Sequence, residues 1–150
     1  MKREILFRGK RTDNGAWVYG YFVKYKPCAL KDEIVYGIVP TYASELYLRE
    51  VDPETVGQYT GLEDKNGQKI FEDDIVEGIA YSFNRRGVIV WIDEITGFGV
   101  RYLGRPDSTA WEKSSILKQI TYGRKDEFAA AVIGNIYDNP ELLEVKHDDD

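Results

Sequence analysis

The sequence contains only one cysteine and one histidine in 150 residues. A single cysteine cannot form an intrachain disulfide, which excludes a small secreted scaffold held together by disulfides. Long apolar runs are also absent, because the longest, at residues 88–92 and 128–133, are far shorter than the roughly 20 residues that cross a bilayer. The first eight residues are basic and lack the apolar stretch of a signal peptide. We therefore expect a soluble, cytoplasmic protein with no membrane partner.

Residues that would prepare a reaction centre are equally scarce. The sequence has neither the phosphate-binding loop that ends in Gly-Lys-Ser/Thr nor a Gly-x-Gly-x-x-Gly motif. Cys28 has Lys26 and Lys31 nearby, but the one histidine that could act as its base, His147, stands in an acidic tail. Such a tail does not hold metal ligands in fixed geometry. We predict no catalytic residues, no cofactor and no metal site.

What the sequence does contain favours β structure. Valine, isoleucine, threonine and the aromatic residues number 52, whereas alanine and leucine number 17. β-branched and aromatic side chains suit a pleated sheet, and alanine and leucine lead the helix formers. Helix is expected only as two short turns, which Asp52 and Asn139 would cap and in which Pro53 and Pro140 would stand at the first helical position. Alternating apolar residues predict strands at residues 4–8, 16–24, 33–39, 45–51, 69–77, 87–92, 99–103 and 132–137.

Three turn sequences join these strands into hairpins. Asn14-Gly15 lies between the first two predicted strands, and Asn66-Gly67 precedes the fifth. Asn-Gly reaches positive φ at little cost, so both pairs predict tight hairpin turns of the primed type. Residues 93–97 can close a third hairpin. Asp64 is placed to accept hydrogen bonds from the backbone of its own turn.

Charge divides the chain unevenly. Residues 1–50 carry nine basic and six acidic residues, whereas residues 51–150 carry eleven and twenty. We place a boundary near Asp52, with an N-terminal β unit at 1–52 and a second β domain at 53–150. The unequal charge is explained either by ordinary solvated surfaces or by docking of the basic part on the acidic part. Docking between copies would make the protein a homo-oligomer.

A basic and aromatic patch near the N-terminus is the one candidate binding site. It consists of Arg8, Lys10, Arg11, Trp17 and Tyr19. Cations bind phosphates and aromatic rings stack on bases, so this combination is typical of nucleic-acid binding. The net charge of −6 opposes such binding for the chain as a whole. The competing interpretation, which we favour, is that these aromatic residues form the buried face of a sheet.

Glu72, Asp73 and Asp74 form the densest acidic cluster within the predicted strands. Paired carboxylates can perform acid–base catalysis, and we keep an enzyme that uses Glu72 and Asp74 as a weaker alternative. On a strand these two side chains would share a side, with Asp73 on the other. A turn that enters a sheet is the interpretation we prefer.

Two segments carry a family resemblance. Residues 55–67 read TVGQYTGLEDKNG and are followed by KIFEDDIV, and residues 132–143 read VIGNIYDNPELL. With the opening ILFRGK and WVYG, these segments resemble the YopX family of phages and prophages, over nearly the whole chain. The family usually has glycine where this sequence has Asp73, and aspartate tolerates positive φ better than most residues. The resemblance implies a phage or prophage setting and a mainly β fold, and it transfers no catalytic residue.

Residues 70–76, 87–92 and 99–103 also look like the start of an SH3-like barrel, an analogy that concerns fold and does not determine function. We therefore predict a mainly β protein with little helix, composed of an N-terminal β-hairpin unit and an SH3-like β barrel over residues 53–150. The expected function is that of a non-enzymatic phage or prophage accessory protein in the cytoplasm of a bacterial host. Its partner would be a protein or a nucleic acid, and the alternative of binding nucleic acid uses the N-terminal patch.

Overall fold

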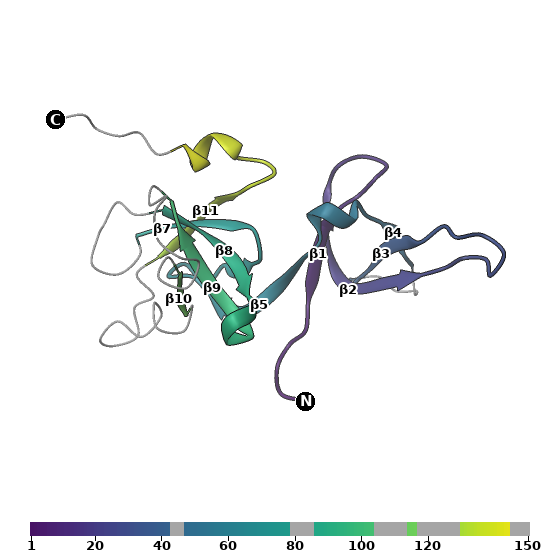
Figure 1. The fold of residues 1–150 in the computed structure, drawn as a ribbon, viewed down its shortest axis with the longest axis horizontal. Coiled ribbons are helices and arrows are strands. Elements are labelled where there is room, and N and C mark those ends of the chain that lie inside the picture. The colour runs from purple at the N-terminus through teal and green to yellow at the C-terminus, as the bar shows by residue number, and fades with distance from the viewer. Residues whose placement is uncertain (43–46, 79–85, 104–113, 117–129, 145–150) are drawn as a thin grey trace. The chain divides into compact units, whose positions relative to one another are not determined.

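The computed structural model describes residues 1–42, 47–78, 86–103, 114–116 and 130–144 (Figure 1). The helices in these ranges are three short 3₁₀ helices: η1 (Pro53–Thr55), η2 (Asp93–Ile95) and η3 (Pro140–Leu143). None of them is long and apolar enough to cross a membrane. His147 lies outside the described residues. The prediction of a mainly β protein with little helix is confirmed.

Two antiparallel sheets contain all the described strands. The first has the order β4 (Arg49–Glu50), β3 (Val35–Pro40), β2 (Trp17–Tyr25), β1 (Phe7–Lys10), β5 (Gly57–Glu63) and β6 (Lys69–Phe71). The second has the order β10 (Ser114–Ile116), β9 (Gly97–Tyr102), β8 (Arg86–Ile92), β7 (Asp74–Glu77) and β11 (Ala131–Asn135). Within the described ranges these sheets do not close, so the SH3-like barrel expected for residues 53–150 is not found there.

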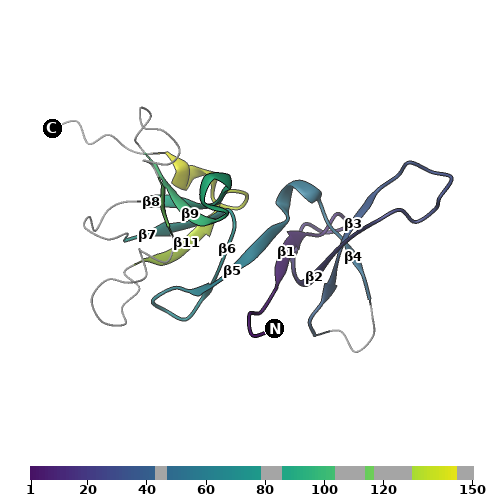
Figure 2. The same cartoon turned by 60° about the horizontal axis from the view of Figure 1, so that its bottom comes forward.

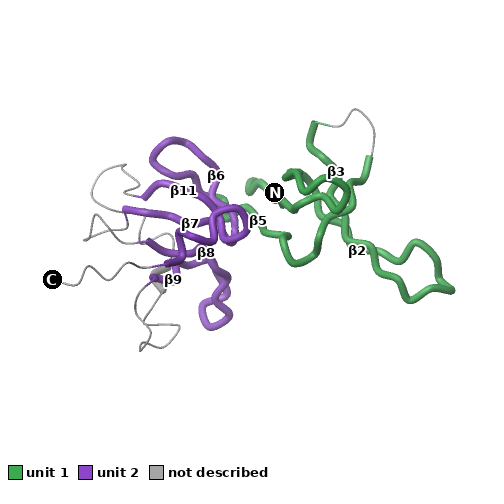
Figure 3. Tube along the Cα trace, turned by 90° about the horizontal axis from the view of Figure 1, so that it is seen from above, with its two compact units in different colours: residues 1–61 green, residues 62–150 purple. Residues whose placement is uncertain are grey.

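The chain divides into two compact units, residues 1–61 (unit 1) and residues 62–150 (unit 2), coloured separately in Figure 3. β5 begins in unit 1, where Gly57 and Gln58 pair with β1, and it ends in unit 2. The predicted boundary near Asp52, between two parts that would fold independently, stays a prediction.

The core of unit 1 lies on one face of its sheet. Val18, Ile38 and Val51 are fully buried, and Phe7 and Phe22 pack beside them with ring centroids 5.6 Å apart. Alternation along each strand sends these side chains to the same side. The far ends of β2 and β3 continue beyond this core as a two-stranded arm (Figures 1 and 2).

The core of unit 2 is built from aliphatic side chains of four strands and of the residue before β11. Ile70, Val76, Ile89, Val100 and Ala130 are buried together. Burial of this kind stabilises by about 25 cal/mol per Å² of apolar surface. The cluster draws on β6 of the first sheet and on β7, β8 and β9 of the second, so it is the core of unit 2 and not of one sheet.

All three predicted hairpins form, but the two Asn-Gly corners do not adopt the predicted primed turns. Gly15 and Gly67 have φ of 69° and 78°, as expected, whereas Asn14 and Asn66 are not among the residues with positive φ. A type I′ turn needs positive φ at both central residues. The Gly67 amide instead donates to the Asp64 carbonyl at 2.9 Å, which places glycine after the turn rather than within it.

Other strand boundaries also differ from the predictions. The strand expected at residues 69–77 is broken into β6 and β7, because Asp73 has φ 66° and turns the chain. β5 is a strand of seven residues in a segment that the sequence indicated only as turns. The strand predicted at residues 45–51 is reduced to the two residues of β4, and residues 45 and 46 lie outside the described ranges.

Candidate binding face on the N-terminal unit

The β1–β2 hairpin places four of the five predicted site residues together. Its register sets Arg8 opposite Tyr19 and Lys10 opposite Trp17. Directly opposed residues in an antiparallel pair point to the same face, so all four side chains lie on one face of the hairpin. Tyr21, two residues after Tyr19, joins them. We call these five residues the aromatic face: Arg8, Lys10, Trp17, Tyr19 and Tyr21.

Trp17 lies between the two cations of this face. The Arg8 guanidinium carbon is 4.7 Å from the centroid of the Trp17 ring, and the Lys10 Nζ is 5.4 Å from it. Cations within about 6 Å of an aromatic ring are attracted by its quadrupole. The Arg8 side chain is almost fully buried, at 6% exposure, whereas Lys10 is half-buried. The cations are therefore held in place by the indole ring.

Tyr19 and Tyr21 are exposed on this face, at 40% and 58%. The interpretation that the aromatic residues of the patch form the buried face of the sheet is therefore wrong for Tyr19, whereas Trp17 is half-buried. The other side of β2 supplies the core through Val18 and Phe22. Both faces of β2 carry apolar or aromatic side chains. The tyrosine hydroxyl can remain in water, whereas Val18 and Phe22 have no polar side-chain atom. Val18 and Phe22 are therefore the side chains that pack in the core.

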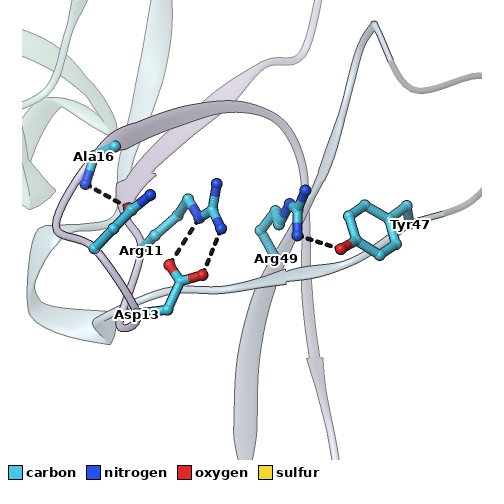
Figure 4. A network of polar contacts seen from close by, with 6 residues as sticks. Arg11, Asp13, Ala16, Tyr47 and Arg49 are labelled. Carbon is cyan, nitrogen blue, oxygen red and sulfur yellow. Dashed lines mark hydrogen bonds and ion pairs between the residues drawn. The ribbon is translucent and has the colours of Figure 1, made fainter.

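Arg11 does not belong to the aromatic face. It follows Lys10 in the chain and therefore projects to the opposite side, where its Nε donates to Asp13 Oδ1 at 2.8 Å (Figure 4). A second hydrogen bond from the same guanidinium makes the pair bidentate. This pairing raises the pKa of Arg11 and lowers the pKa of Asp13. Arg11 is thus occupied in fixing the hairpin loop.

A second arginine, Arg49, lies near this loop and is stacked on a tyrosine. Its guanidinium carbon is 3.8 Å from the centroid of the Tyr47 ring, and it donates a hydrogen bond to the Tyr47 hydroxyl (Figure 4). Tyr47 also contributes to the raised pKa of Arg11. The Thr12 amide donates to the Glu50 carbonyl at 3.1 Å, which ties β4 to the hairpin loop.

Two carboxylates of the acidic cluster, Asp73 and Asp74, accept hydrogen bonds from other residues of unit 2. Asp74 is 1% exposed, and its Oδ2 accepts a hydrogen bond from the Phe71 amide at 2.8 Å. Asp73 Oδ2 accepts from the Tyr137 hydroxyl at 2.7 Å. The preferred interpretation of a turn that enters a sheet is confirmed. Within the described ranges no three histidine, cysteine or acidic residues are grouped so that they could hold a metal ion.

Comparison with known proteins identifies the family. The family model described as YopX protein matches residues 6–144. The chain belongs to the YopX family. A solved structure similar to this YopX chain is the crystal structure of protein EF1440 from Enterococcus faecalis, with 25% identity over 95% of this chain and 100% of that one and a TM-score of 0.50. None of the curated proteins searched matches this chain.

The segments that carried the YopX resemblance hold unit 2 together. Asp64 is buried, and its Oδ1 accepts from the amides of Asn66 at 2.8 Å and Gln68 at 2.9 Å. Its Oδ2 accepts from the Val132 amide at 2.9 Å. The predicted role of Asp64 in its own turn is confirmed, and the contact with Val132 joins two family segments that lie 68 residues apart.

A comparable polar turn follows β11. The side-chain oxygen of Asn135 accepts from the amides of Tyr137 at 3.1 Å and Asp138 at 2.9 Å. Asn139 Oδ1 accepts from the Asn135 amide at 3.3 Å, so it does not cap η3 as predicted. These side chains satisfy backbone groups that would otherwise be costly to bury. The YopX segments therefore have a structural explanation that needs no ligand.

Proposed function

We propose that this YopX protein is a non-enzymatic interaction module, and that its aromatic face is where a macromolecule binds. The observation that carries the proposal is the exposure of Tyr19 and Tyr21 beside two cations, on the face opposite the core of unit 1. Tyrosine, tryptophan and arginine are the residues most enriched at the energetic centres of interfaces. The family resemblance supports a phage or prophage setting, and the composition supports a cytoplasmic one.

The alternative of an enzyme that uses Glu72 and Asp74 has less support. The Asp74 carboxylate is buried and accepts from the Phe71 amide. A carboxylate held in this way serves the backbone, whereas a general acid or base must reach a substrate. A ligand of the aromatic face can reach the exposed Tyr19 and Tyr21 without breaking these hydrogen bonds.

Affinity capture from phage-infected or prophage-induced bacterial cells tests the proposed function. The wild-type protein, the double variant Tyr19→Ser/Tyr21→Ser and the control Tyr42→Ser are used as baits. Tyr42 is 79% exposed and lies outside the aromatic face, so it matches the loss of an exposed tyrosine. We expect protein or nucleic acid that is retained by the wild type and the control and lost with the double variant. Identical capture by all three baits would contradict the proposal.

Self-association is a second property that we propose, on the ground of the uneven charge. Residues 1–50 are net basic and residues 51–150 are net acidic. Complementary patches attract one another, and salt weakens that attraction. Light scattering at low and high salt measures it, and a monomeric mass at low salt would rule out association between copies.

A further inference from the structure

Building on the proposed function, we infer that the ligand of the aromatic face is single-stranded nucleic acid. Tyr19 and Tyr21 stack on bases, and Lys10 contacts the phosphate backbone. Arg8 is a positioning residue that contacts the Trp17 ring. The inference rests on the spacing of the rings and on the placement of the cations.

The spacing of the two tyrosines fits bases that are separated from one another. Residues two apart on an antiparallel strand are about 6.8 Å apart along it. This is about twice the 3.4 Å rise per nucleotide of one strand in a duplex. Tyr19 and Tyr21 can therefore each contact a base only where neighbouring bases are unstacked. A duplex covers both faces of every base, so the geometry favours a single strand.

The cations are placed to follow the sugar–phosphate backbone of such a strand. β1 runs beside β2 at about 4.8 Å, which sets Lys10 and Arg8 alongside the row of aromatic rings. Trp17 is already in contact with both cations, so Tyr19 and Tyr21 are the rings left with exposed surface. Because Arg8 is almost fully buried, Lys10 supplies the phosphate contact.

One carboxylate of unit 1 that shares this side of the sheet is separated from the two tyrosines by a strand. Register places Glu50 on the same side of the sheet as Tyr21, but on β4, with β3 between it and β2. The five residues of the aromatic face include no carboxylate. Among these five residues the positive charge comes from Arg8 and Lys10, and with a net charge of −6 for the whole chain we expect weak, strongly salt-dependent binding.

Fluorescence anisotropy with labelled oligonucleotides at low salt tests the inference. The probes are a mixed-sequence single-stranded DNA, the matching single-stranded RNA and the same DNA as a duplex. We expect the wild-type protein to bind a single strand with a Kd of about 1–100 µM and the duplex at least about tenfold more weakly. The two single-stranded probes distinguish DNA from RNA as the source of the ligand.

Variants separate stacking from charge. Tyr19→Ala and Tyr21→Ala should each weaken binding about fivefold or more, whereas Tyr19→Phe and Tyr21→Phe, which keep the ring, should bind as the wild type does. Lys10→Gln should weaken binding and reduce the salt slope by about 0.7. Tyr42→Ser serves as the control for surface tyrosines. Thermal melting of each variant verifies that the unit is folded.

Three results would overturn the inference. One is absence of binding to either single strand at 100 µM protein, and another is equal binding of single strands and duplex. The third is binding that the alanine variants leave unchanged. If the capture experiment meanwhile yields a protein or a second copy of this chain that depends on Tyr19 and Tyr21, the proposed function stands and the nucleic-acid ligand is wrong. If capture also shows no dependence on these tyrosines, both proposals fail.

Discussion

Unit 1 and unit 2 use polar and aromatic side chains in opposite ways. Unit 2 buries carboxylates and amides, and each accepts hydrogen bonds from backbone amides, as Asp64, Asp74 and Asn135 do. Unit 1 leaves Tyr19 and Tyr21 in water on one face of its sheet. A buried carboxylate is costly unless it is paired, whereas an exposed tyrosine costs little. The segments with the clearest YopX pattern therefore maintain the fold, and the binding face that we propose lies on unit 1.

The substitution with the largest expected effect on the stability of unit 1 relative to unit 2 is Gly20→Ala. An added Cβ at residue 20 would lie 1.9 Å from the Val39 carbonyl oxygen, so β2 and β3 would have to separate. We expect unit 1 to lose about 3 kcal/mol or more of stability, above the usual cost of overpacking. Gly97→Ala is the matched control, because its nearest heavy atom is 3.7 Å away. Urea unfolding measures both, and equal midpoints would show that stability in unit 1 does not depend on this close approach.

Asp64→Ala tests the buried carboxylates of unit 2. The variant leaves the amides of Asn66, Gln68 and Val132 without their acceptor. We expect a loss of about 2 kcal/mol, because amides near the surface can bond to water and the Val132 amide cannot do so as easily. Glu63→Ala, at an exposed neighbour, should change stability by less than about 0.5 kcal/mol. Hydrogen exchange at Val132 locates the effect, and unchanged protection there would count against the role of Asp64.

A smaller effect is expected from Gly67→Val. Gly67 has φ 78° and open space around it, so the cost is backbone strain and not collision. We predict a loss of about 1–2 kcal/mol. Gly67→Asn is the control, since asparagine tolerates this conformation better than valine. Differential scanning calorimetry should rank the wild type, the asparagine variant and the valine variant in that order, and an unchanged valine variant would disprove positive φ at this turn.

The smallest effect concerns the Arg11–Asp13 ion pair of unit 1. The hydrogen bond from Arg11 lowers the pKa of Asp13 below its ordinary value of 3.8. The pair therefore stabilises the folded state above that value, and its contribution is lost as pH falls through the lower folded pKa. Because the pair is exposed, Asp13→Asn should lower Tm only slightly at neutral pH, and this difference should shrink as the pH falls below the ordinary pKa of aspartate. A Tm difference that persists in acid would contradict this assignment.

The sequence predicted local features well where one residue determines them. Asp64 accepts from its own turn, Gly15 and Gly67 take positive φ, and Asp52 caps η1 through the Glu54 amide. Asp73 adopts the positive φ for which the family uses glycine. Each depends on neighbours within about four residues, which is the range that sequence patterns report.

Features that depend on distant partners were predicted poorly. Gly57–Glu63 is rich in glycine and was interpreted as turns, yet β1 supplies a partner that makes it a strand. The candidate site included Arg11, whose side chain leaves the aromatic face for Asp13, and omitted Tyr21, although its spacing from Trp17 and Tyr19 was visible. Strand alternation identified the shared face but not its exposure to water.

The sequence alone determined the mainly β composition, the hairpin corners and the row of aromatic residues on one side of β2, because propensity and the alternation of side chains act within a few residues. Only the tertiary structure decided which side of β2 is buried. Both sides are apolar enough to form a core, and the choice follows from Ile38 and Val51, which come from other strands and segments and pack on Val18. Tyr19 and Tyr21 are left exposed because the core of unit 1 lies on the other side of the same sheet.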